Sequence, residues 1–367
     1  MKGPHASSWV HSVAAVLARL AWPFARLWAR RGYFTPRRGG FGLLSPDGQA
    51  RIAIVACHWI GDTVWASQVV PALRARFPKA ELFVFSKPHC MDLWEGLIEP
   101  DHRISAAEVI SDRRRESVAW RAIARLAARH RPSGFDVVID LTGNRYSALF
   151  TFLLRPGYSI GFDGNECGWL YSSNVRDAER IGRHLMERPF RVIEPLIGSF
   201  CPPELPAPPQ TTVSPATLCA ELGLPGDYAV LAPGAGWPAK QWPAERFVLA
   251  REAFNAARLA VVIAGSAAET SLCQAVAGPA NCVAAGLPLS NIIALLKAAR
   301  GFVGNDSGLG HLAAALGVPT AVIFTGATDP ALCRPLGPAH TVKVFLGDPP
   351  VPEVVAHVLG VARASCP

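Results

Sequence analysis

Apolar residues recur along the chain in two alternating patterns, short continuous runs and longer segments with helical spacing. From residue 51, the runs RIAIVAC and AELFVFS have the length of buried strands, whereas TVWASQVVPALRARF between them has helical periodicity. The runs FDVVIDLTG and YSIGFD then flank the segment SALFTFLL. Apolar strands separated by amphipathic helices indicate a parallel sheet that is covered on both faces.

The same alternation restarts in the second half, after a break at residues 201–215, CPPELPAPPQTTVSP. So many prolines prevent a helix or strand from persisting there, which is typical of a linker. The strand-like runs that follow are YAVLAPG, LAVVIAG, NCVAAG, GFVGN and TAVIFTG, with helical segments between them. We therefore predict an α/β fold with two doubly wound Rossmann-like domains facing a cleft, at residues 49–200 and 216–367, after a leader at 1–48. A length of 367 residues also favours two domains.

Charge is distributed unevenly. The formal net charge is +8, but the first 48 residues hold seven Lys or Arg residues against one acid, Asp47. The remainder is nearly balanced, which disfavours nucleic acid as a partner. The nine cysteines form no Cys-x-x-Cys pair, so the sequence favours buried thiols in a reducing cytoplasm over a zinc ribbon or a disulfide scaffold.

The basic leader has apolar residues at helical spacing, with arginines on another face. This pattern predicts a helix lying on an anionic membrane surface. The alternative is an arm that packs on the body, because Pro23 interrupts the pattern. No uncharged run is long enough to span a bilayer, and no secretory cleavage site follows.

The segment GFVGNDSGLGHLAAALGVPTAVIFTGATDP, residues 301–330, places Asn-Asp-Ser-Gly between a strand and a helix. Helix N-termini attract phosphates, so we expect Gly308 and Gly310 to let an anion approach the backbone and Ser307 to cap the helix or bind an oxygen. Asp306 can accept hydrogen bonds from sugar hydroxyls. The alternative is that Asp306 and Ser307 only cap the helix and that His311 is a structural residue of its first turn.

A second strand-to-helix loop lies in LAPGAGWPAKQWPAERF. Gly234, Ala235 and Gly236 provide an open turn, and Lys240 is suited to binding a diphosphate as a point charge. The same residues match Gly-x-Gly-x-x-Ala, although Trp237 and the nearby prolines interrupt the helix start that a dinucleotide fingerprint needs.

Gly61 and Asp62 follow the first strand of the opposite domain. A carboxylate facing a diphosphate is a natural general base for an incoming hydroxyl, and the alternative role of Asp62 is a helix cap. Glu269, soon after the strand AVVIAG, is a candidate ribose ligand or a favourable first-turn acid.

Candidates for acceptor binding lie elsewhere in the first half. Asn144 and Arg145 follow the strand FDVVID, and Arg121 and Arg125 share one helix face with Arg129. The alternative for the arginines is a solvated helix face.

Taken together, the motifs resemble those of glycosyltransferase family nine, the bacterial ADP-heptose:lipopolysaccharide heptosyltransferases. The resemblance runs from about residue 51 to about 340 and is carried by Gly61-Asp62, DVVIDLTGNRYSALF, PGAGWPAKQWPAERF and GNDSGLGHLAAALGVPTAVIFTGATDP. It departs from the family at Ser307, where threonine is usual, and at Leu309-Gly310, where Pro-Met is usual.

This resemblance implies a GT-B fold, with the acceptor on the N-terminal domain and an ADP-heptose donor on the C-terminal one. It implies that Asp62 is the catalytic base, that Lys240 contacts the donor phosphate, that Glu269 binds ribose and that Leu287 lies in the region lining the base. The remaining donor-site positions are Asp306, Ser307, Gly308 and His311. The implied reaction is an inverting transfer of heptose to a lipopolysaccharide core or related glycan.

No Asp-x-Asp motif occurs, so we expect no metal site and no cofactor. We expect the enzyme in the cytoplasm, at the inner face of the inner membrane if the leader binds lipid. Three alternatives stay open at this point: a transferase that uses another nucleotide sugar, an NAD-dependent oxidoreductase, and a membrane-surface binding protein without turnover.

Overall fold

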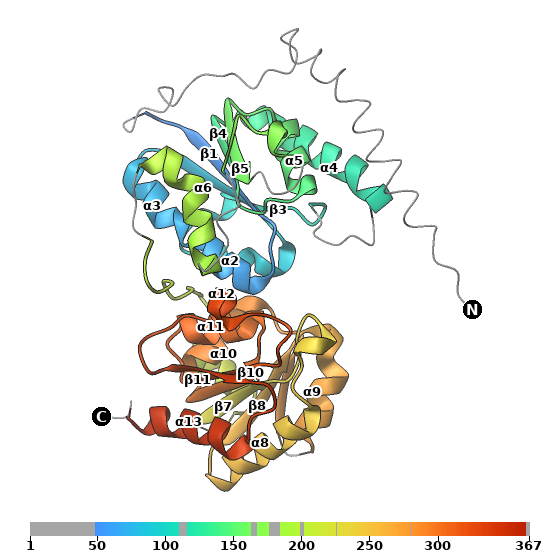
Figure 1. The fold of residues 1–367 in the computed structure, drawn as a ribbon, viewed down its shortest axis with the longest axis vertical. Coiled ribbons are helices and arrows are strands. Elements are labelled where there is room, and N and C mark those ends of the chain that lie inside the picture. Colours follow the sequence, from blue (N-terminus) through green and yellow to red (C-terminus); the bar gives the residue numbers. More distant parts are fainter. Residues whose placement is uncertain are drawn as a thin grey trace, which may run out of the picture.

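The computed structural model describes residues 48–109, 116–162, 167–175, 184–198, 202–224, 226–279 and 281–364. The predicted leader helix lies outside the described residues. Two α/β units follow one another along the chain, and Figure 1 shows them stacked along the long axis of the molecule.

Each unit contains one six-stranded sheet in which all neighbouring strands are parallel. The first sheet has the order β3-β2-β1-β4-β5-β6 and the second the order β12-β11-β10-β7-β8-β9. The strands are β1 (Arg51–Ala56), β2 (Glu81–Ser86), β3 (Arg103–Ser105), β4 (Val137–Asp140), β5 (Tyr158–Phe162), β6 (Ser173–Val175), β7 (Tyr228–Ala232), β8 (Ala260–Gly265), β9 (Cys282–Ala285), β10 (Gly301–Asn305), β11 (Thr320–Phe324) and β12 (Val342–Leu346). In the first sheet, successive strands are added on one side of β1 and then, from β4 on, on its other side. The second sheet has the same reversal in strand order between β7 and β10. Ligands bind at such switch points in open α/β sheets.

Helices connect the strands and cover both faces of each sheet. The α-helices are α2 (Ile60–Ser67), α3 (Val69–Arg76), α4 (Glu116–His130), α5 (Arg145–Leu154), α6 (Arg188–Ile197), α7 (Pro215–Glu221), α8 (Ala244–Ala256), α9 (Thr270–Ala277), α10 (Leu289–Ala298), α11 (Gly308–Ala315), α12 (Pro330–Cys333) and α13 (Val351–Ala364). The short 3₁₀ helices are η2 (Pro88–Trp94), η3 (Pro100–His102), η5 (Arg131–Ser133), η6 (Gly168–Leu170), η7 (Leu185–Glu187), η8 (Pro238–Lys240) and η9 (Ala267–Glu269). No helix in the described part of the chain has both the length and the apolar character needed to cross a membrane.

The predicted two-sheet α/β fold is confirmed, with differences at the level of single elements. The segment expected to form one helix after β1 forms two, α2 and α3, which meet at Gln68. Pro71 explains the break, because it lacks an N–H to donate to the preceding turn and therefore stands in the first turn of a new helix. The edge strands β3, β6 and β12 were not predicted, since they are short or only partly apolar.

The proline-rich connection contains no helix or strand between residues 202 and 214, and Pro215 opens α7. It is tied to the first unit through Gln68, whose Oε1 accepts a hydrogen bond from Ala207 N at 2.6 Å. The domain bounds of 49–200 and 216–367 stay a prediction.

The two units share apolar packing as well as this connection. Val64 and Leu93 of the first unit belong to the same buried cluster as Ile292 and Leu312 of the second. Figure 1 shows α2 at the edge of the first unit that faces α11 and α12. Apolar side chains from both units therefore fill part of the space between them.

The N-terminal ends of α2 and α11 meet at two glycines. A Cβ atom on Gly61 would lie 2.7 Å from Cδ2 of His311, and one on Gly308 would lie 2.6 Å from Cβ of Ile60. Neither distance is compatible with a side chain, so glycine at both positions permits the close approach of the two helices.

We predict that Gly61→Ala destabilises the protein by about 1 to 3 kcal/mol, because the added methyl group overpacks a contact in which His311 is itself buried. The unfolding midpoint in urea measures this change. Gly360→Ala is the matched control, since no atom lies within 4 Å of a Cβ built in that helix. An unfolding midpoint unchanged in Gly61→Ala would contradict the proposed tight contact.

Candidate functional site

A cleft of about 940 Å³ lies between the two units. Residues that follow β1 and β2 line it from the first unit, and residues that follow β7, β8, β9, β10 and β11 line it from the second. The cleft thus lies at the carboxyl ends of both sheets, as expected for ligand sites in this class of fold.

All the candidate donor-binding residues line this cleft, although they come from four separate loops. They are Gly234, Ala235, Gly236, Lys240, Glu269, Leu287, Asp306, Ser307, Gly308 and His311. Asp62 lines the same cleft from the opposite unit. The structure therefore brings the proposed base and the proposed donor site together, while their individual roles stay predictions.

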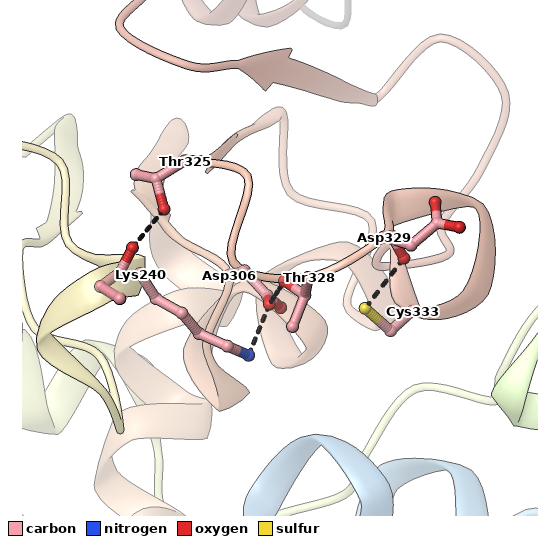
Figure 2. Close-up of polar contacts among 7 residues, drawn as sticks. Lys240, Asp306, Thr325, Thr328, Asp329 and Cys333 are labelled. Atoms are coloured by element: carbon pink, nitrogen blue, oxygen red, sulfur yellow. Dashed lines mark hydrogen bonds and ion pairs between the residues drawn. The ribbon is translucent and has the colours of Figure 1, made fainter.

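Lys240 and Asp306 form an ion pair across two of these loops. Nζ of Lys240 donates a hydrogen bond to Oδ2 of Asp306 at 2.6 Å, and the hydroxyl of Thr328 donates to the same oxygen at 2.6 Å (Figure 2). The Lys240 side chain is 18% exposed and the Asp306 side chain 6%. Because both groups are largely withdrawn from water, the lysine charge is held in a fixed place at the cleft wall.

The fully buried Asn305 side chain positions this pair. Its Nδ2 donates to the carbonyl oxygens of Pro233 at 2.8 Å and Gly234 at 3.3 Å, and its Oδ1 accepts from Trp242 N at 2.8 Å. These bonds fix both ends of the loop that carries Lys240. The hydroxyl of Thr325 also donates to Ala239 O at 2.6 Å, which holds η8 against the end of β11 (Figure 2).

Glu269 lies against the Gly234 turn. Its Oε2 accepts from the Ser266 N–H at 2.7 Å and from the Ser266 hydroxyl at 2.8 Å, so it completes a capping box at η9. A Cβ on Gly234 would lie 2.0 Å from Glu269 Oε1, so any larger residue there would displace the carboxylate. The carboxylate thus has a structural role before any ligand binds.

The start of α11 leaves polar groups without partners. Ser307 is at the N-cap position, but its side chain makes no capping hydrogen bond, contrary to the capping alternative. Its Oγ and Nδ1 of His311 are both buried and unpaired among the described residues. Unpaired buried polar atoms are unfavourable, and a helix N-terminus attracts anions, so both features fit a site that an anionic ligand completes.

His311 is held neutral by its surroundings. Burial lowers its pKa to about 4, with the Asp306 and Asp62 carboxylates opposing this shift. Its ring also packs edge-on against Trp65, with 4.8 Å between ring centroids. A neutral imidazole at the helix N-terminus adds no further positive charge there.

Asp62 lies half-buried in the first turn of α2, whose N-cap is Trp59. It is therefore not a capping residue, contrary to the alternative considered from sequence. Burial lowers the pKa of the neighbouring His58, an effect that the Asp62 carboxylate opposes. The His58 ring donates through Nε2 to the Leu141 carbonyl at 2.9 Å, which ties the end of β1 to the loop after β4.

None of the four candidate acceptor residues is among the described residues that line the cleft. Asn144 caps α5, since its Oδ1 accepts from the N–H groups of Tyr146 and Ser147 at 2.9 Å each. The Arg145 guanidinium lies over the Tyr146 ring, and Arg121 and Arg125 are exposed on α4. Their contact with an acceptor stays a prediction.

Several cleft residues were missed from sequence. Thr328 follows β11 and could have been found by the same rule that selected the other loops. The exposed Trp59 and Trp237 are next to the Gly61-Asp62 and Gly234–Gly236 motifs. Trp65 lies within a helix, where nothing in the sequence indicates a cleft residue. Among the residues described, no three His, Cys, Asp or Glu side chains gather in a way that could hold a metal ion.

The fold agrees with comparisons to known proteins. Residues 123–356 match the family described as "Glycosyltransferase family 9 (heptosyltransferase)". The chain therefore belongs to this glycosyltransferase family.

Individual relatives support this assignment. The chain is 26% identical over 319 residues to lipopolysaccharide heptosyltransferase 2 of Salmonella typhimurium, covering 80% of this chain and 87% of the relative. It is similarly 25% identical to lipopolysaccharide heptosyltransferase 2 of Escherichia coli over 80% of this chain and 87% of that one. The solved ADP-heptose heptosyltransferase II of E. coli superposes with a TM-score of 0.73 at 22% identity, covering 86% of this chain and 99% of that chain, and so shares the GT-B fold.

We predict that His311 stays neutral until the pH falls to about 4. The unfolded chain, with a histidine pKa near 6.5, binds more protons across this interval, so stability falls as the pH falls from about 6.5 to about 4. Across this interval, His311 lowers the free energy of unfolding by about 3 kcal/mol. Imidazole NMR shifts measure the titration, and urea unfolding at pH 7 and pH 5 measures the stability.

The stability difference between the two pH values should shrink in His311→Gln. The residual pH dependence then comes from other histidines with lowered pKa values, such as His58 and His184. Titration of His311 near pH 6.5 in the native protein would contradict the burial argument.

Proposed function

We propose that this glycosyltransferase transfers heptose from ADP-heptose to a hydroxyl group of a lipopolysaccharide core or related glycan, with inversion at the anomeric carbon. The observation that carries the proposal is that Asp62 of one unit lines the same cleft as Lys240 and the start of α11 of the other. The names of the relatives support the choice of heptose and lipopolysaccharide.

The second unit offers the groups that a nucleoside diphosphate needs. Lys240 provides a fixed positive charge, and the N–H groups at the start of α11 carry the positive end of the helix dipole. Leu287 and Leu289 line the same cleft and can pack against a base, and we assign Glu269 to a ribose hydroxyl. We assign the domain at 216–367 to the donor on this basis.

In the proposed reaction, an acceptor hydroxyl attacks the anomeric carbon while its proton passes to the Asp62 carboxylate. The bond between that carbon and the diphosphate oxygen breaks, and ADP leaves with the electron pair. Lys240 and the α11 N-terminus stabilise the negative charge that develops on the leaving oxygen. The donor's negative charge also competes with Asp306 for Lys240, so the ion pair of the free protein becomes a shared contact.

The acceptor is assigned to the domain at 49–200, because Asp62 belongs to it. Asn144, Arg145, Arg121 and Arg125 remain our candidates for contacts to the acceptor beyond the cleft. We further propose that the enzyme needs no metal or other cofactor, acts in the cytoplasm without a nucleic-acid partner, and contacts the anionic inner membrane surface through its basic leader.

An NAD-dependent oxidoreductase is disfavoured by local geometry. Trp237 and Pro238 follow the Gly234–Gly236 turn and enter η8. A dinucleotide fingerprint instead requires its glycines to open a helix that receives the pyrophosphate.

We predict that Lys240→Ala weakens ADP binding by about 1.5 to 3 kcal/mol, the usual scale for a hydrogen bond to a charged group. Calorimetric titration with ADP, GDP, UDP and NADH measures the affinity and the base preference. Lys343→Ala removes the same charge from an exposed position on β12 and should leave ADP affinity unchanged. Equal ADP affinity in Lys240→Ala and native protein would make Lys240 a structural residue.

We predict that Asp62→Asn lowers turnover roughly 10²- to 10⁴-fold. The amide retains the shape of the side chain but cannot take up the proton of the attacking hydroxyl group. Release of ADP from ADP-heptose in the presence of a heptose-deficient lipopolysaccharide measures turnover. ADP affinity should be retained. Asp101→Asn, at an exposed position outside the cleft, is the control, and near-native turnover in Asp62→Asn would remove the base assignment.

A further inference from the structure

Trp59 is an exposed aromatic residue with a fixed backbone. Its side chain is 63% exposed although it lines the cleft. Its carbonyl oxygen accepts hydrogen bonds from both the N–H and the hydroxyl of Thr63, each at 2.9 Å. The ring is thus carried by a rigid helix start at the wall of the cleft.

The side chains around the indole fix its orientation. Nζ of Lys87 lies 4.3 Å from the ring centroid, over one face, and the tilted ring of His89 lies 5.9 Å away. A cation over an indole face is attracted by the electrons of the ring, so Lys87 holds the ring from that side.

The position of the ring relative to Asp62 gives it a functional meaning. Trp59 is the N-cap of α2, and Asp62 is three residues further on, in the first turn. Both residues line the same wall of the cleft. A ligand lying on the indole would therefore have its hydroxyl groups beside the Asp62 carboxylate.

We propose that Trp59 is the stacking platform for the acceptor, and that it takes a pyranose ring. One face of a pyranose presents several C–H groups, which are apolar and slightly positive, and an indole face is apolar and slightly negative. Stacking leaves the hydroxyl groups at the ring edge free to reach Asp62. The assignment rests on the proposed function and adds to it the residue that orients the acceptor sugar.

The donor is a less suitable ligand for the Trp59 ring than the acceptor. The candidate donor residues belong to the second unit, and that wall has its own exposed tryptophan, Trp237, at 61% exposure. Nζ of Lys240 lies 5.1 Å from the centroid of the Trp237 ring, so Trp237 stands beside the proposed diphosphate site. Trp59 stands instead beside the proposed base, on the wall that carries the acceptor.

Indole NMR of the full-length ¹⁵N-labelled protein tests the platform directly, without turnover. The Trp59 resonance is assigned from the spectrum of Trp59→Phe, and the protein is titrated with methyl glucopyranoside, mannopyranoside and galactopyranoside in the presence of ADP. We expect at least one pyranoside to shift the Trp59 resonance in a saturable manner. The linear alditols glucitol, mannitol and galactitol, which have no ring face, should not shift it.

Trp169 provides an internal control in the same spectra, because it is 49% exposed and lies outside the cleft. Absence of a Trp59 shift with all three pyranosides, equal shifts with the alditols, or a matching response of Trp169 would each overturn the proposal.

Calorimetry separates this proposal from the proposed function. ADP should bind Trp59→Ala as tightly as the native protein, and a loss of ADP affinity would assign the ring to the donor and overturn the platform. If ADP binding depends on Lys240 but no pyranoside shifts the Trp59 resonance, the stacking role of Trp59 is wrong and the proposed transferase function is retained. If ADP binding fails in the native protein, the proposed function fails on its own test.

Discussion

The buried amide of Asn305 is the constraint on which the donor side of the cleft depends. It joins the end of β10 to both ends of the loop that follows β7, through Pro233, Gly234 and Trp242. An unpaired buried polar group costs about 1 to 3 kcal/mol, so the loop cannot leave this position without losing several satisfied bonds. Lys240 meets Asp306 because the loop that carries it is held there.

A second constraint is the close approach of two helix N-termini from different units. The starts of α2 and α11 both carry partial positive charge, and Gly61 and Gly308 bring them into contact. Asp62 and Asp306 offset this charge, and His311 adds none because burial keeps it neutral. The two carboxylates therefore reduce the repulsion between helix starts that lie this close together.

The two walls of the cleft differ in chemistry. The wall of the second unit combines a lysine, a helix N-terminus and apolar residues after β9, which together match a nucleoside diphosphate. The wall of the first unit combines a carboxylate with an exposed indole, which suits a neutral sugar face and a hydroxyl to be deprotonated. An inverting transfer needs this division, because nucleophile and leaving group lie on opposite sides of the reacting carbon.

The sequence by itself determined the two parallel sheets, since continuous apolar runs such as those of β1 and β11, separated by helical segments, are typical of strands covered on both faces. It also determined which loops carry chemistry, because Asp62, Lys240 and Asp306 each follow a strand at its carboxyl end. The tertiary structure alone decided that Lys240 pairs with Asp306, that Thr328 joins them and that Asn144 is engaged in capping α5. These facts depend on contacts between loops far apart in sequence, and on which hydrogen-bond partners remain after folding, and neither is encoded in local periodicity.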